Sequence, residues 1–101
     1  MSKVTKDGGK IVVRPEQDIV ASIANDFKGE LKKLLDDGAT QMAVDLAEVK
    51  MIDSSGLGVL IAAHNSLQKL GAALELLNIS DDIRKLLCNM RLDKHFILQS
   101  N

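Results

Sequence analysis

The chain is poor in the residue types that mark several classes of protein. It contains two phenylalanines, Phe27 and Phe96, and no tryptophan or tyrosine. Proteins that bind single-stranded nucleic acid stack the bases on aromatic side chains, so no such surface is expected here. A single cysteine, Cys88, excludes an internal disulfide and a cysteine-rich metal site, and it fits a reducing compartment. Leu, Ile, Val and Ala must therefore build the core.

The chain also lacks an excess of charge and a long apolar segment. Its 13 basic and 14 acidic residues leave a net charge of -1, so the basic surface of a nucleic-acid-binding protein is absent. The apolar segment over residues 56–63 is far too short to span a bilayer. The first ten residues, MSKVTKDGGK, have no apolar stretch like that of a secretory signal. We expect a cytoplasmic protein that binds no nucleic acid and does not insert into a membrane.

What the chain does contain is the composition of a globular domain. Of its 101 residues, 46% are hydrophobic and 27% are charged, which is enough for one hydrophobic core and no second one. We expect a single domain over residues 1–101, with its core between about residues 3 and 98.

Alternating segments of two kinds predict the fold class. Short β-branched or apolar runs, typical of strands, occupy residues 3–6, 11–15, 42–46, 73–79 and 95–98. Apolar residues at helical spacing predict helices over residues 20–35, 54–70 and 80–90, the first two ended by Gly38 and Gly71 and the third capped by Ser80. The order β-β-α-β-α-β-α-β predicts an α/β domain, with a mostly parallel mixed β-sheet and helices packed on it. Because the third strand is apolar at nearly every position, we expect both of its faces to be covered.

The start of the second predicted helix carries an unusual polar cluster. Asp53, Ser54 and Ser55 stand where backbone N–H groups lack partners, and Asp or Ser there is a good helix cap. Capping accounts for one of these residues and does not account for the second serine. Gly56 and Gly58 cost helix stability, so we expect them to let another backbone or a bulky partner approach closely.

A catalytic role for these serines is not supported. The cluster follows the loop over residues 47–53, beyond the carboxyl end of a strand, where sites form in open α/β sheets. A nucleophile elbow at Ser55 would need glycine at the position of Asp53. His64 lies about two and a half turns further along the same helix, too far to serve easily as a base, which leaves His95 alone. No Walker A sequence is present. We expect no enzyme, no cofactor and no metal site.

Three further side chains have structural interpretations. We expect His64 to be an exposed or half-buried helix residue rather than a metal ligand, because no second ligand stands at metal-binding spacing. Cys88 is interpreted as a buried structural thiol rather than a redox centre. Met51, just ahead of the serines, fits equally the core or a contact with a partner.

The run MIDSSGLGVL, residues 51–60, resembles the signature of the STAS domain as found in bacterial anti-sigma factor antagonists. The resemblance extends from about Lys3 to Leu98 and includes the later LELLNISDDIRKLL. It implies a STAS-like α/β fold. In that family the serine immediately before the glycine, here Ser55, is phosphorylated by a partner kinase that is also the anti-sigma factor. Ser54 would then be a local structural or hydrogen-bonding residue.

The resemblance also implies a surface for the partner. The family usually has GELD between the second strand and the first helix, and PEQD, residues 15–18, stands at that place here. Glu16 and Asp18 match, whereas Pro15 and Gln17 depart from the pattern, which bears on the shape of the loop and on the partner that fits it. The implied partner-binding residues are Glu16, Asp18, Asp53, Ser54, Ser55, Gly56 and Leu57.

The implied function is a regulatory switch. The unphosphorylated chain would bind an anti-sigma factor serine kinase and release a sigma factor, phosphorylation at Ser55 would end the interaction, and a Ser/Thr phosphatase would restore it. We expect the free protein to be a monomer. The alternative is a STAS scaffold subunit of a signalling or transport complex without sigma-factor regulation. An esterase-like enzyme that uses Ser55 is a third interpretation, which lacks an evident base.

Overall fold

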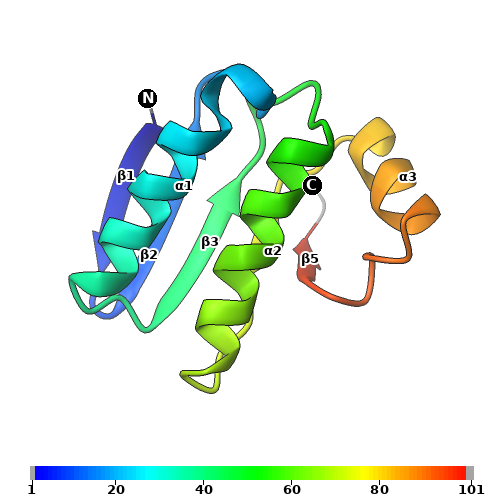
Figure 1. Cartoon of the computed structure of the whole chain (residues 1–101). Helices are drawn as coiled ribbons and strands as arrows, with labels where there is room; N and C mark the ends of the chain where they lie inside the picture. The colour runs from blue at the N-terminus through cyan, green and yellow to red at the C-terminus, as the bar shows by residue number, and fades with distance from the viewer. Residues whose placement is uncertain (1, 100–101) are drawn as a thin grey trace.

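The structure is a computed structural model, and it describes residues 2–99. The strands are β1 (Ser2–Asp7), β2 (Lys10–Pro15), β3 (Gln41–Asp45), β4 (Glu75–Leu77) and β5 (Ile97–Gln99). The helices are α1 (Ala21–Asp36), α2 (Ser54–Gln68) and α3 (Asp81–Asn89). This order along the chain, which can be followed in Figure 1, confirms the predicted fold class.

The strands form one sheet in the order β1-β2-β3-β4-β5. β1 and β2 pair in antiparallel fashion and form a hairpin, whose two connecting residues are Gly8 and Gly9. β2, β3, β4 and β5 are parallel, and a helix connects each successive pair. Because these four strands run parallel, their carboxyl ends lie at the same edge of the sheet.

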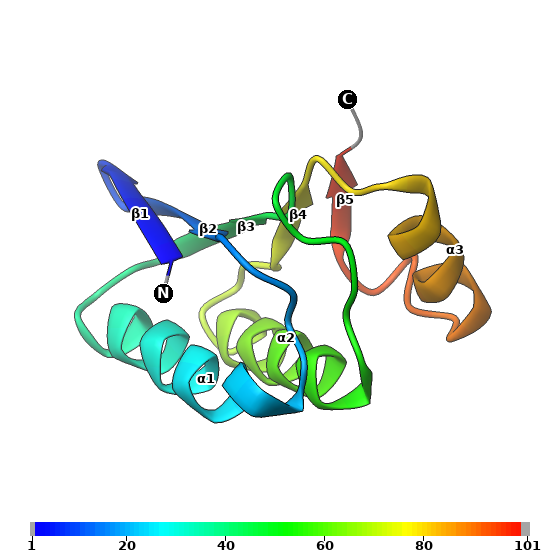
Figure 2. The ribbon, with the colours of Figure 1, turned by 90° about the horizontal axis from the view of Figure 1, so that it is seen from above.

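The helices do not cover both faces of the sheet. Figure 2 shows α1 and α2 side by side beneath it and α3 beside β5 at its end, while the opposite face carries none of the helices formed by residues 2–99. The core lies between the sheet and the helices, where Val13, Val44, Leu60, Leu67 and Leu76 are fully buried. Within residues 2–99, none of the helices has the length and apolar composition that crossing a lipid bilayer requires.

The burial of β3 has a different cause from the one expected. Met42, Ala43 and Val44 are all buried, although only one face of the strand is packed against helices. On the other face, an ion pair between Lys10 of β2 and Glu75 of β4, with 3.0 Å between nitrogen and oxygen, crosses β3. The expectation that both faces of the strand are covered is therefore confirmed, with helices on one face and the long side chains of Lys10 and Glu75 over the small Ala43 on the other.

Helix ends follow the predicted signals, whereas the last two strands are shorter than predicted. Gly38 and Gly71 follow α1 and α2 with φ of 107° and 78°, a conformation that favours glycine. Ser80 caps α3, because its side-chain oxygen accepts a hydrogen bond from the Ile83 N–H at 3.1 Å. β4 ends where Asn78 adopts φ of 56°, and β5 begins after Phe96, whose side chain turns into the core.

Candidate functional site

Two loops at the carboxyl ends of β2 and β3 lie together at the top of Figure 1. The first, residues 16–20, leads into α1, and the second, residues 46–53, leads into α2. A parallel bridge between Ile19 and Ile52 joins them, and the Ile19 N–H donates to the Met51 carbonyl at 3.1 Å. The pairing of β2 with β3 thus continues beyond the strands and sets the two helix starts next to one another.

Asp18 holds the second loop through its backbone. One oxygen of its carboxylate accepts hydrogen bonds from the Lys50 N–H at 2.8 Å and the Met51 N–H at 3.2 Å. This contact presents the Met51 side chain to solvent, with 56% of its surface exposed. Of the two interpretations open for Met51, packing in the core is therefore wrong.

Asp53 caps two helices at once. Its Oδ1 accepts from the Gly56 N–H at 2.9 Å, which closes the first turn of α2. Its Oδ2 accepts from the Ala21 N–H at 2.9 Å, at the start of α1, where Val20 provides no side-chain cap. The hydrogen bond from Gly56, aided by the one from Ala21 and opposed by partial desolvation, lowers the pKa of the Asp53 carboxyl. Asp53 is therefore ionised at neutral pH.

Gly56 lies where the two loops approach so closely that no side chain fits. A Cβ atom at this position would overlap the Ile19 carbonyl oxygen and crowd the side chains of Ile19 and Ile52. The predicted close approach of another backbone is therefore confirmed for Gly56. It does not hold for Gly58, where a Cβ would meet no atom within 4 Å.

Ser54 and Ser55 are the first two residues of α2, and both are exposed. Among residues 2–99, no hydrogen-bond partner of either hydroxyl is found, and the cap of the helix is Asp53. The local hydrogen-bonding role expected for Ser54 is thus taken by Asp53. Both hydroxyls are open to a modifying enzyme, and the fold does not distinguish them.

The other residues of the predicted partner surface divide between surface and interior. Glu16 is exposed and forms an ion pair with Lys3 at 3.7 Å. Gly56 is buried, and Leu57, with 4% of its surface exposed, packs in the core. Glu16 and the two serines can touch a partner directly, whereas Gly56 and Leu57 shape the backbone beneath them.

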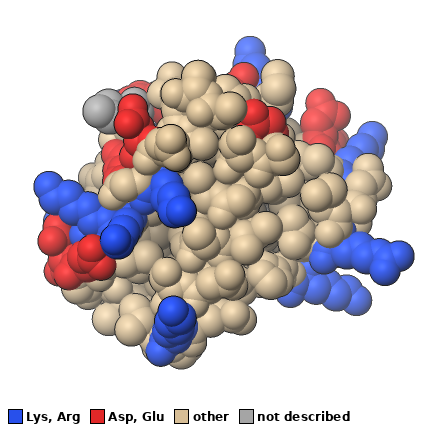
Figure 3. Space-filling model, in the orientation of Figure 1, with Lys and Arg blue, Asp and Glu red and all other residues tan. Residues whose placement is uncertain are grey.

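The exposed side of α2 is uncharged. The sequence of the helix, SSGLGVLIAAHNSLQ, contains no Asp, Glu, Lys or Arg. Figure 3, in the orientation of Figure 1, shows an uncharged area over the middle of this face, with the charged side chains around it. A partner at the serines therefore meets an uncharged helix face next to the ionised Asp53, and a phosphate would add negative charge there.

His64 is buried, which corrects the expectation of an exposed or half-buried side chain. Only 2% of its surface is exposed, and its Nδ1 accepts a hydrogen bond from the Leu74 N–H at 3.1 Å. The ring centroid lies 4.5 Å from that of His95 and 5.3 Å from that of Phe96. Burial, and to a smaller extent the charge of His95, lowers the pKa of His64. Its burial could have been predicted from the sequence, because His64 stands four residues after Leu60 and three before Leu67, on the same face of the helix as these buried leucines.

Cys88 is exposed, so the prediction of a buried thiol is wrong. α3 buries Ile83 and Leu87, and the position after Leu87 turns outward. Met90, the last residue of the helix predicted over residues 80–90, follows the observed helix and has 53% of its surface exposed. The helix is too short for the stripe to extend over a further turn.

Comparison with known families decides the classification. A family model for the STAS domain matches residues 1–101. The chain belongs to the STAS domain family. No curated protein sequence was found to match this STAS domain.

Solved structures similar to this STAS domain include regulatory proteins and a member of a transporter family. TM1081 of Thermotoga maritima is 20% identical with a TM-score of 0.94, and the match covers 99% of this chain and 86% of that one. The Bacillus protein SpoIIAA, solved in its phosphorylated form, is 17% identical with a TM-score of 0.78, covering 100% and 92%. A sulfate transporter family protein of Wolinella succinogenes is 18% identical with a TM-score of 0.81, covering 96% and 81%. At these identities the likeness concerns the fold.

Proposed function

We propose that this STAS domain is an anti-sigma factor antagonist, a non-enzymatic switch controlled by phosphorylation at Ser55. The free protein is a cytoplasmic monomer. In the unphosphorylated state it binds an anti-sigma factor serine kinase and so releases a sigma factor. Phosphorylation by that kinase ends the interaction, and a Ser/Thr phosphatase restores it. The observation that carries the proposal is the exposed, unengaged Ser55 hydroxyl at the start of an uncharged helix, beside a carboxylate that already caps it.

The fold supports a switch that acts on the contact surface. Phosphorylation adds about -1.5 to -2 charges, and the helix dipole favours this anion by only about 0.3–1 kcal/mol. The Gly56 N–H already donates to the ionised Asp53, so the phosphate gains little from the helix itself. Changing a partner from mostly bound to mostly free takes about 5.5 kcal/mol of differential affinity. That difference must arise where the phosphate faces the partner.

A phosphorylation assay tests the proposal. The purified chain is incubated with ATP and the anti-sigma factor kinase encoded in the same genome, and the phosphorylated residue is mapped by mass spectrometry. We expect one phosphate, on Ser55, lost in Ser55→Ala and kept in Ser54→Ala. Ser54 is the matched control, because both serines are exposed in the same helical turn. No phosphate, or a phosphate that persists in Ser55→Ala, would contradict the proposal.

The second candidate is a scaffold subunit of a transport or signalling complex. The likeness to the Wolinella sulfate transporter family protein favours it. This role requires no phosphate on Ser55. It replaces the first proposal if the kinase neither binds nor phosphorylates the chain and a purified transporter or receptor binds it instead.

A further inference from the structure

Met51 is a large apolar side chain displayed beside the serines. Five large hydrophobic side chains of residues 2–99 are exposed, namely Val4, Met51, Leu70, Met90 and Ile97. Of these five, only Met51 lies in the two paired loops at the carboxyl ends of β2 and β3. Single exposed hydrophobic side chains are common on protein surfaces, so exposure alone assigns no role. The position of Met51 and the way its backbone is held are what indicate one.

The backbone of Met51 is held on both sides by the first loop. Its N–H donates to the Asp18 carboxylate at 3.2 Å, and its carbonyl accepts from the Ile19 N–H at 3.1 Å. Ile52, the next residue, forms the bridge to Ile19 and is buried, with 5% of its surface exposed. The chain is thus fixed with Ile52 toward the core and Met51 toward solvent. Because the backbone is already ordered, little conformational freedom is lost when a partner binds this side chain.

Met51 lies within the area that a protein bound at Ser55 covers. Consecutive Cα atoms are about 3.8 Å apart, so the Cα atoms of Met51 and Ser55 are separated by at most about 15 Å. A specific interface covers about 800 Å² on each partner, which corresponds to a patch about 30 Å wide. A partner centred on Ser55 therefore covers Met51 as well.

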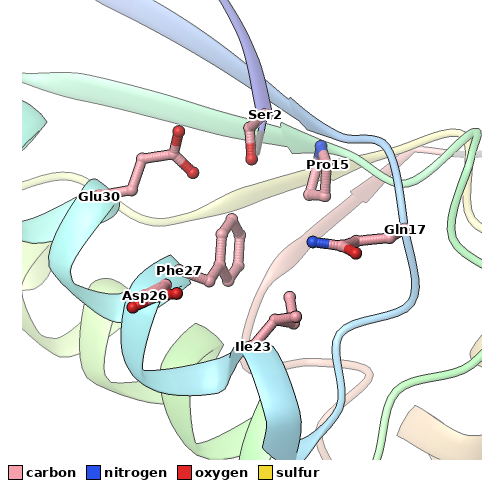
Figure 4. A pocket seen from close by; sticks show the side chains of 7 residues that line it. All are labelled: Ser2, Pro15, Gln17, Ile23, Asp26, Phe27 and Glu30. Carbon is pink, nitrogen blue, oxygen red and sulfur yellow. The ribbon is translucent and has the colours of Figure 1, made fainter.

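The cavity shown in Figure 4 lies apart from the loop that carries Met51. It encloses about 140 Å³ between the end of β2 and α1, and all of its lining residues lie between Ser2 and Glu30. None of them comes from residues 46–53 or from α2, which carry Met51 and the serines. The apolar contact that this loop offers is instead a protruding side chain, so its complement is a hollow on the partner.

We propose that Met51 is an apolar anchor for the protein that binds at Ser55, and that its side chain enters an apolar pocket of that protein. Methionine suits this task, because its flexible and polarisable side chain adapts to the shape of a pocket. In most interfaces a few buried side chains carry most of the binding energy. This inference rests on the proposed function. The contact is separate from the phosphoacceptor, so it contributes to the choice of partner.

Binding of the anti-sigma factor kinase to Met51→Ala, measured by calorimetry without ATP, tests the proposal. The control is Leu70→Ala, because Leu70 is equally exposed, 57% against 56% for Met51, and follows the far end of α2. At 1.5 Å per residue, it lies about 20 Å along the helix from Ser55, beyond the expected patch. Both side chains are exposed, so neither substitution should change the melting temperature appreciably.

We expect Met51→Ala to bind about tenfold more weakly or worse, and Leu70→Ala to stay within about twofold of the unmodified chain. The loss in Met51→Ala should be the same at low and high salt, because an apolar contact is not screened. Met51→Leu should bind within about threefold, because leucine restores an apolar side chain of similar volume. A photoreactive amino acid at position 51 should crosslink to the kinase, and one at position 70 should not.

The outcomes separate this inference from the proposed function. If the kinase phosphorylates Ser55 but binds Met51→Ala as tightly as the unmodified chain, the anchor is overturned and the proposed function stands. If the kinase neither binds nor phosphorylates the unmodified chain, both are overturned.

Discussion

At the scale of single residues, Asp53 connects the helix starts that surround the serines. Its two oxygens accept from the Gly56 N–H in α2 and the Ala21 N–H in α1, and the latter is 32 residues away. The sequence predicts a cap at this position, because an acid precedes a helix. The sequence does not predict that Asp53 also caps α1, because this contact depends on how β2 and β3 place their loops. Asp53 is therefore a structural residue for both loops as well as a neighbour of Ser55.

The pH dependence of stability tests this role of Asp53. Because hydrogen bonds lower its pKa in the folded state, Asp53 contributes stability above the unfolded value of about 3.9. That contribution is lost as the pH falls through the lower, folded value. We expect Asp53→Asn to have a lower melting temperature than the unmodified chain at pH 7. Below pH 4 the difference between the two melting temperatures should shrink. A constant difference between the two proteins across this range would contradict the assigned role.

Gly56 and Gly58 form a matched pair, because both lie in the first turns of α2 and only Gly56 touches another loop. We expect Gly56→Ala to lower the free energy of unfolding by about 1–3 kcal/mol, because its Cβ would overlap the Ile19 carbonyl. Gly58→Ala should raise it by up to about 1 kcal/mol, because alanine is the better helix former. Urea unfolding measures both. Equal effects of the two substitutions would contradict the close approach at Gly56.

At the scale of elements, His64 connects α2 to the last part of the sheet. It accepts a hydrogen bond from the Leu74 N–H just ahead of β4 and touches His95 and Phe96 just ahead of β5. The apolar spacing of α2 places position 64 on the buried side, but a polar residue there was interpreted as a surface residue. Burial was possible because Leu74 supplies a donor to Nδ1.

Because His64 is buried, we expect the folded protein to lose stability in mild acid. Its pKa is lowered in the folded state, so the unfolded chain takes up a proton at a higher pH, near 6.5. Stability should therefore fall as the pH drops below about 6.5, until the folded protein is also protonated. We expect His64→Gln to be less stable at pH 7.5 and to lose less stability between pH 7 and 5. His95→Gln should keep most of the decline, because burial is the larger cause of the lowered pKa of His64 and the charge of His95 the smaller one. A steep decline that persists in His64→Gln would assign the effect to another group.

At the scale of the whole molecule, the sequence predicts the order of elements and the mixed sheet. Apolar runs and helical stripes alternate clearly, and glycines mark the ends of the first two helices. The sequence does not predict that one face of the sheet carries none of the helices of residues 2–99. The apolar residues of β3 do not reveal that Lys10 and Glu75, on the neighbouring strands, cover Ala43. The position of the serines beyond the carboxyl ends of the strands was predicted correctly. Only the structure shows that, within residues 2–99, neither serine hydroxyl has a hydrogen-bond partner.

The affinity of the kinase for the chain before and after phosphorylation tests the central claim most directly. Both forms are titrated into the anti-sigma factor kinase by calorimetry, and their circular dichroism spectra and melting temperatures are compared. We expect the unphosphorylated chain to bind and the Ser55-phosphorylated chain to bind more weakly by a factor of up to about 10⁴, with the fold unchanged. Equal affinities of the two forms, or a phosphorylated chain that unfolds, would contradict a charge switch at the contact surface.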